Sequence, residues 1–168
     1  MALIVQKYGG TSVANPDRIK NVAKRVAKFQ AQGHQVVVVV SAMSGETNKL
    51  IALAKEVQAT PDPRELDAIM STGEQVTTGL LSMALMDIGC KAKSYTGGQV
   101  KVLTDSTHTK ARILSIEEAN MRRDLDAGQR RDQRTGKAAF EHQAAPGFLE
   151  DRIDGERIAT DQPLLQFL

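Results

Sequence analysis

A lysine, two glycines and two hydroxyl residues near the start of the chain could together handle a phosphate group. The apolar residues 2–5 are followed by Lys7, Tyr8, Gly9, Gly10, Thr11 and Ser12. Glycine lets a backbone approach an anion closely, and N–H groups with neighbouring hydroxyls can point at phosphate oxygens. A lysine ammonium adds positive charge where negative charge develops during phosphoryl transfer. The alternative is an ordinary strand-to-helix turn with a surface lysine.

A second loop with small polar residues follows five consecutive valines at residues 36–40. An unbroken β-branched run is typical of a strand buried on both faces of a parallel sheet. Ligands of open α/β sheets gather at the carboxyl ends of the strands, so this loop and residues 7–12 could face one crevice. Ser41 and Thr47 in this loop could contact a carboxylate or a phosphate, or they could cap the following helix.

Glu74 is the best candidate for recognising a substrate ammonium group. It lies in residues 71–75, Ser-Thr-Gly-Glu-Gln, beside small residues rather than on an open charged face. A carboxylate in such a place can hold an ammonium group through a charge-assisted hydrogen bond. The alternative is an exposed helical glutamate. We assign no metal-binding residue, because no metal-ligand spacing connects His34, His108 and His142.

Alternating strand and helix patterns would position these residues. Apolar residues at three- and four-residue spacing predict a helix over about residues 16–32 with Asn15 as its cap. Further helices are expected over residues 47–58, 64–71 and 76–86, with an interruption at 71–75, and strands over 2–5, 36–40, 92–95 and 100–103. This alternation with short connections predicts an α/β fold, a three-layer sandwich with a mainly parallel sheet.

Composition narrows the class of protein. A length of 168 residues favours a single domain. The net charge of +2 is too small to create a positive electrostatic field that would attract nucleic acid. The single cysteine, Cys90, suits a reducing compartment. The sequence contains neither a signal peptide pattern nor an apolar stretch of the roughly 18 residues that a membrane span needs. We therefore expect a cytoplasmic protein that binds neither nucleic acid nor membrane.

Several segments resemble aspartokinases, in that family's order and at its spacing. They are residues 7–13, 38–48, 64–67, 71–75, 104–106 and 110–113. The resemblance runs from Ala2 to about Gly128. It implies an amino-acid-kinase fold and transfer of the γ-phosphoryl group of ATP, with Mg²⁺, to the β-carboxylate of L-aspartate. That reaction is the first step of lysine, threonine and methionine biosynthesis.

The resemblance also implies roles for individual residues. Lys7 would be the catalytic residue that stabilises the transferring phosphoryl group. The ATP or phosphate site would comprise Lys7, Tyr8, Gly9, Gly10, Ser12 and Ser41. Thr47 and Glu74 would bind aspartate, with Glu74 holding its amino group.

The chain departs from the family's pattern after Gly128. Residues 129–168 contain six Lys or Arg and seven Asp or Glu, with few apolar runs. We expect residues 1–128 to be the N-terminal portion of an amino-acid-kinase domain, incomplete at its C-terminus, and residues 129–168 to be an unrelated or disordered tail, without regulatory domains. A frameshift or fusion would give such an end, and a genuine but unfamiliar segment is the alternative.

Three functions are compatible with these patterns. The first is an aspartate kinase, although a truncated chain could be inactive alone. The second is a non-catalytic substrate-binding or assembly fragment that associates with itself or with a full-length kinase. The third is a related kinase acting on glutamate, a carbamate or a nucleotide, which residues 41–48 and 71–75 disfavour because they match the aspartate enzymes.

Overall fold

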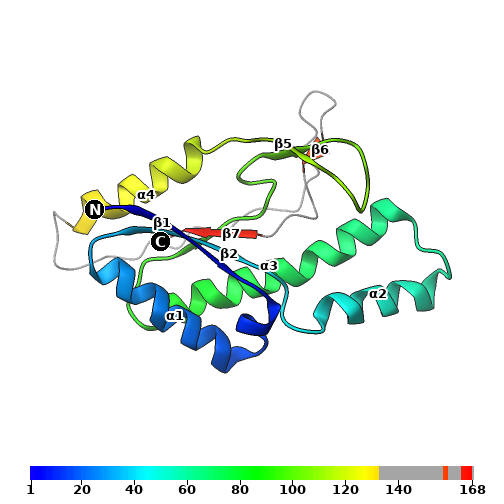
Figure 1. Ribbon diagram of the computed structural model, residues 1–168, viewed down its shortest axis with the longest axis horizontal. Coiled ribbons are helices and arrows are strands. Elements are labelled where there is room, and N and C mark those ends of the chain that lie inside the picture. The colour runs from blue at the N-terminus through cyan, green and yellow to red at the C-terminus, as the bar shows by residue number, and fades with distance from the viewer. Residues whose placement is uncertain (133–156, 159–163, 168) are drawn as a thin grey trace.

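The computed structural model describes residues 1–132, 157–158 and 164–167 (Figure 1). Its helices are η1 (Gly10–Val13), α1 (Pro16–Ala31), α2 (Glu46–Val57), α3 (Pro63–Asp87) and α4 (Ala119–Asp132). Its strands are β1 (Leu3–Tyr8), β2 (Gln35–Val40), β3 (Lys93–Ser94), β4 (Val102–Thr104), β5 (Ile113–Ile116), β6 (Arg157–Ile158) and β7 (Leu164–Phe167).

A four-stranded sheet with the order β1-β2-β7-β3 forms the centre of the molecule. β1 and β2 are parallel, whereas β7 pairs antiparallel with both β2 and β3. It follows that β1, β2 and β3 all run in one direction. A smaller sheet with the order β5-β4-β6 is antiparallel. The predicted α/β class is confirmed, and the antiparallel insertion of β7 is a feature that the sequence did not predict.

Apolar clusters on the two faces of β2 hold the layers together. Val36, Val38 and Val40 pack in a cluster with buried residues of α1 and α3. On the opposite face, Val37 packs in a second cluster that includes Leu125 of α4. The central sheet therefore lies between α1 and α3 on one side and α4 with the small sheet on the other (Figure 1). The expectation of a valine strand buried on both faces is confirmed.

The start of α1 follows the local sequence. The Asn15 side chain accepts a hydrogen bond from the Arg18 backbone N–H at 3.0 Å, and Pro16 occupies the first turn. Asparagine at the cap accepts a hydrogen bond from a first-turn backbone N–H that has no partner within the helix. Proline fits the first turn because its missing N–H is not needed there. The predicted cap is confirmed.

The prediction of a break at residues 71–75 is wrong, because α3 is one continuous helix of 25 residues. The hydroxyls of Ser71 and Thr72 donate to the carbonyls of Ala68 and Ile69 within the helix. These bonds satisfy side chains that would otherwise compete with helical hydrogen bonding. Glu74 consequently projects from a rigid helix rather than from a loop.

The end of one strand also differs from the sequence-based expectation. β1 extends to Tyr8 rather than ending at Val5, because Lys7 and Tyr8 stay in register with Val39 and Val40 of β2. The expected domain boundary after Gly128 falls inside α4. The end of α4 (residues 129–132), β6 and β7 belong to the segment expected to be an unrelated or disordered tail, and the rest of that segment lies outside the described residues.

A cluster of polar side chains ties α4 to the region of β3. Lys93 and Tyr95 both donate hydrogen bonds to Oδ2 of Asp124, and the Lys93 ammonium lies 5.0 Å from the centre of the Tyr95 ring. Burial raises the pKa of Asp124, but the hydrogen bonds from Lys93 and Tyr95 and the positive charge of Lys93 outweigh it. The pKa of Asp124 is therefore held below its ordinary value.

Replacing Leu81 of α3 with alanine should lower the free energy of unfolding by about 2–5 kcal/mol, because it leaves a cavity in a fully buried position. Met83→Ala on the same helix is the control, since Met83 is 67% exposed. Urea titrations followed by circular dichroism compare the two variants. Equal losses for both would contradict the assigned core.

The depressed pKa of Asp124 predicts a specific pH dependence of stability. A carboxylate whose pKa is lower in the folded state stabilises the fold above its unfolded pKa of about 3.9, and this contribution is lost as the pH falls through the folded value. The stability gap between the parent chain and Asp124→Asn should therefore shrink below about pH 4. Urea titrations across that range measure the gap, with Asp87→Asn, at an exposed position, as control. A gap independent of pH would refute the assignment.

Candidate functional site

The loops that follow β1 and β2 lie side by side at one edge of the sheet. The strands are parallel, and their last residues, Tyr8 and Val40, are paired in register. The Ser41 backbone N–H donates to the Tyr8 carbonyl at 3.1 Å, which continues the pairing past the end of β2. The structure therefore brings residues 9–13 and 41–45 together, as the parallel arrangement predicted.

Ala42 is the point at which three of the motif segments meet. A Cβ added to Gly10 would lie 2.9 Å from the Ala42 carbonyl oxygen, and one added to Gly73 would lie 3.0 Å from the Ala42 Cβ. Oε1 of Glu74 accepts the Ala42 backbone N–H at 3.2 Å. A side chain at Gly10 would displace the Ala42 backbone, and one at Gly73 would press on the Ala42 side chain, so these two glycines favour the close meeting of the two loops and α3.

Glu74 has one structural partner and capacity for others. Its side chain is half-buried on α3, and its contact with Ala42 uses one lone pair of the carboxylate. An ionised carboxylate offers about four acceptor positions, so the Ala42 contact leaves capacity for further donors. The alternative of an exposed helical glutamate does not describe this residue.

Lys7 and Tyr8 point to opposite faces of β1, because successive strand residues alternate. Lys7 is exposed, whereas Tyr8 is buried in the core cluster next to α1 and donates its phenol proton to Gln6 at 2.9 Å. Burial raises the pKa of the Tyr8 phenol, while the charge and hydrogen bond of the Arg25 guanidinium act to lower it.

The predicted hydroxyl residues occupy separate positions around these loops. Ser41 and Thr47 are half-buried, and Thr47 lies in the first turn of α2. The N-cap of α2 is Gly45, so neither hydroxyl fills the capping role considered as the alternative. Ser12 lines a pocket on the α1 side of β1 together with arginine side chains. The structure therefore places Ser12 on the face away from the Lys7 side chain.

Sequence reasoning did not assign a role to Asp67, which is only 3% exposed on α3. Both of its carboxylate oxygens accept the Thr109 backbone N–H, at 3.2 and 2.9 Å, and Oδ2 lies 3.3 Å from Nδ1 of His108. Asp67 and Glu74 are seven residues apart, so they share one face of the helix. Asp67 holds the loop that contains Thr109 against α3, and Glu74 holds the loop that contains Ala42. The isolated acid within an apolar helical pattern was the available signal.

The described residues contain neither a metal cluster nor a membrane-spanning helix. No group of three or more His, Cys, Asp or Glu side chains there could hold a metal ion. Within the same part of the chain, no helix is long and apolar enough to cross a membrane.

The chain belongs to the amino acid kinase family, whose model matches residues 2–130. Within that family it is similar to the aspartokinase of Pseudomonas aeruginosa, with 63% identity over 129 residues that cover 77% of this chain and 31% of that protein. The chain thus spans about a third of the length of the curated relatives it matches. The resemblance to aspartokinases seen in the motifs is confirmed.

Solved structures agree with this assignment. An aspartate kinase from Synechocystis matches with a TM-score of 0.58 and 48% identity, covering 60% of this chain and 17% of that one. The E. coli aspartokinase III in complex with aspartate and ADP matches with a TM-score of 0.63 over 76% of this chain and 39% of that one. Since its identity is 22%, that second match supports the fold alone.

Gly10→Ala should destabilise the chain by about 1–3 kcal/mol, because the new Cβ would press against the Ala42 carbonyl oxygen. Gly9→Ala is the matched control, since a Cβ at Gly9 would meet no atom within 4 Å. Thermal and urea unfolding measure both variants. If neither variant lowered the stability of the chain, the assigned close contact between Gly10 and Ala42 would be wrong.

Proposed function

We propose that this chain supplies the phosphate loop and the aspartate site of an aspartate kinase, which transfers the γ-phosphoryl group of ATP to the β-carboxylate of L-aspartate. The observation that carries this proposal is the convergence of three motif segments on Ala42. The identity of 63% to an aspartokinase over the same residues supports it.

Lys7 is the residue that we assign to catalysis. Its side chain is exposed at the end of β1 and forms no ion pair with a described carboxylate. Phosphoryl transfer between two anions depends mainly on positioning and on neutralising charge. An unpaired ammonium beside the loop of Gly9 and Gly10 would lower the barrier by stabilising charge on the transferring group.

Glu74 and Thr47 would bind L-aspartate from two sides of the loop that begins at Ser41. The Glu74 carboxylate would accept hydrogen bonds from the substrate ammonium, and the Thr47 hydroxyl would donate to a substrate carboxylate. Thr47 also belongs to the first turn of α2, whose backbone N–H groups and dipole favour an anion. We assign Ser41 to the phosphate side because it follows β2 directly beside Tyr8.

No cluster of three or more His, Cys, Asp or Glu side chains that could hold a metal ion exists among the described residues. Mg²⁺ is often held largely by nucleotide phosphates and water, with one or two carboxylates. We therefore assign no residue of this chain to the metal and derive no step through it.

The role of Glu74 can be separated from its structural contact. Glu74→Gln retains an oxygen that can accept the Ala42 N–H, so the melting temperature should stay close to that of the parent chain. The lost charge should weaken L-aspartate binding about tenfold or more, measured by isothermal titration calorimetry. Glu56→Gln, at an exposed position on α2, is the charge-matched control. Unchanged aspartate affinity in Glu74→Gln would refute this role.

A hydroxamate assay with ATP, Mg²⁺ and L-aspartate tests the reaction itself. Formation of aspartyl hydroxamate that is abolished by Lys7→Ala is the expected result for a kinase site within the chain. Phosphorylation of glutamate instead of aspartate would contradict the proposed substrate. A folded chain that binds aspartate but forms no product would favour the second candidate below.

The second candidate function is that of a non-catalytic fragment associating with itself or with a full-length kinase. The supporting observation is an apolar groove of about 290 Å³ between β1 and α4, lined by Leu3, Val5, Val37, Ile116, Glu118, Met121, Arg122 and Leu125. Val5 is 63% exposed there, and an exposed apolar surface on an edge strand favours association. Sedimentation velocity over a range of concentrations, with Val5→Thr for comparison, tests this candidate.

A further inference from the structure

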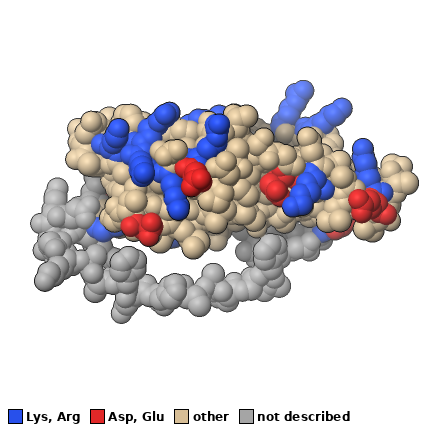
Figure 2. All heavy atoms as spheres, turned by 90° about the horizontal axis from the view of Figure 1, so that it is seen from below, with Lys and Arg blue, Asp and Glu red and all other residues tan. Residues whose placement is uncertain are grey.

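The outer face of α1 carries positive charge that the described residues do not neutralise. The helix contains Asp17 and five cationic residues, namely Arg18, Lys20, Lys24, Arg25 and Lys28. None of the five forms an ion pair with a described carboxylate. Figure 2 shows Lys and Arg atoms gathered over this part of the molecule. This surplus of positive charge favours the approach of an anion to this face of the helix.

A pocket of about 340 Å³ opens beside this helix. It is lined by Tyr8, Ser12, Arg18, Asn21, Val22 and Arg25. Its lining contains two guanidinium groups, a hydroxyl, a phenol and an amide, and no carboxylate. Small-molecule sites usually have volumes of about 300–1,000 Å³, so this pocket suits a compact ligand. Its chemistry favours one that accepts hydrogen bonds and carries negative charge.

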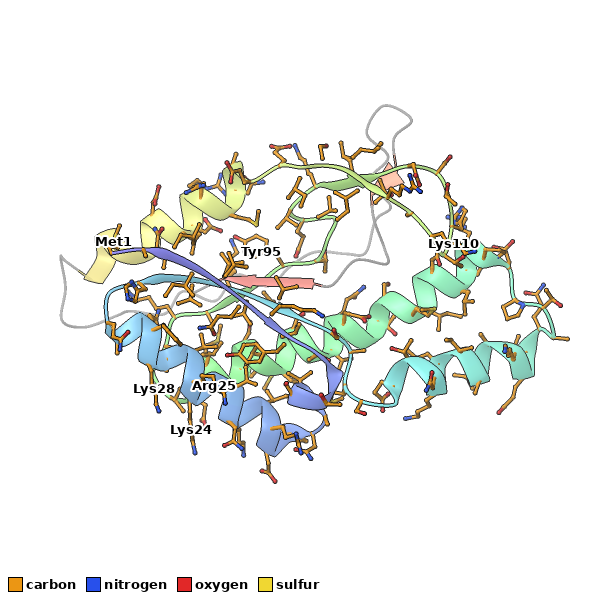
Figure 3. The ribbon with its side chains drawn as sticks, viewed as in Figure 1. Met1, Lys24, Arg25, Lys28, Tyr95 and Lys110 are labelled. Atoms are coloured by element: carbon orange, nitrogen blue, oxygen red, sulfur yellow. The ribbon has the colours of Figure 1, made fainter. Side chains whose placement is uncertain are left out.

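The two arginines are held in place by neighbours and keep donors for a ligand. Nη1 of Arg18 donates to the Thr11 carbonyl at 3.0 Å. The Arg25 guanidinium lies close enough to the phenol of Tyr8 for its positive charge to act on the pKa of that phenol, and the phenol is itself fixed by its bond to Gln6. A guanidinium has five N–H donors in a planar fork, so these contacts leave most of them available. Lys24 and Lys28, in contrast, point away from the sheet (Figure 3).

We propose that this pocket is a second anion site, which binds a small phosphate-bearing molecule between the guanidinium groups of Arg18 and Arg25. Planar guanidinium groups match phosphate oxygens in pairs, and two of them suit a ligand with more than one negative charge. The pocket is lined by Tyr8 and Ser12, two residues that the resemblance assigned to the ATP or phosphate site, but it lies on the face of β1 opposite to the Lys7 side chain, so its anion would not be the phosphoryl group that Lys7 contacts. Ser12 belongs to both the pocket and η1, so a bound anion would also restrain the loop that carries Gly10.

The test is a titration of the full 168-residue chain with pyrophosphate, followed by nitrogen–proton correlation spectra. The expected result is saturable shifts of the Ser12 and Asn21 amides. Arg25→Gln and Arg18→Gln should each weaken binding about tenfold or more. Lys24→Gln removes the same charge from α1 outside the pocket and should change the affinity by less than about twofold. Lys7→Ala should leave these shifts in place.

Several outcomes would overturn the proposal. Absence of saturable binding would exclude the site, and equal weakening by Lys24→Gln would show only diffuse attraction to the helix. If the shifts were lost in Lys7→Ala but kept in Arg25→Gln, the anion would bind at the phosphate loop and not between the arginines. Tighter binding of citrate than of pyrophosphate would contradict the phosphate chemistry. Circular dichroism verifies the fold of each variant, and Arg18→Gln decides the result if Arg25→Gln does not fold.

Discussion

The close packing around Ala42 is the constraint on which the rest of the site depends. Gly10 approaches Ala42 so closely that a side chain there would displace backbone, Gly73 packs tightly against the Ala42 side chain, and Glu74 bonds to the same residue's N–H. Protein interiors are packed too densely to absorb an extra atom at such a point without displacing backbone. The small residues are thus what allows the phosphate loop, the loop after β2 and α3 to form one surface.

The sheet supports this surface because β2 is buried on both sides. Its valines contribute to two clusters, one with α1 and α3 and one with Tyr95 and α4. A strand enclosed in this way is held in register, since a slip of one residue would exchange the two faces. Register matters for function here, because it places the ends of β1 and β2 side by side.

Helix α3 connects the site to more distant segments. Asp67 holds residue Thr109 and Glu74 holds Ala42, so one face of one helix positions two loops that are far apart in sequence. On the same side of the sheet, Arg18 of α1 donates to the Thr11 carbonyl and Arg25 lies near the Tyr8 phenol. Residues 7–12 therefore separate two chemically different surfaces, one with Lys7 and one with the two arginines.

The sequence by itself determined the family, the α/β class and the main motif segments. The valine run, the Asn15-Pro16 helix start and the glycine pair are local signals, and the structure forms each element where local chemistry places it. Residue types also identified Lys7 and Glu74 as the charged groups of interest. Such properties are readable from the chain because they depend on neighbours within a few residues.

Tertiary structure decided what depends on contacts between distant residues. The continuity of α3 through Gly73 was mispredicted, because a helix-weakening glycine is tolerated where Ala42 packs against it. β1 extends to Tyr8 because β2 offers pairing partners, and β7 joins the sheet through pairing with β2 and β3. The partners of Asp67 and the gathering of Arg18 and Arg25 at one pocket likewise depend on distant residues, since only the packing of the layers brings these groups within reach.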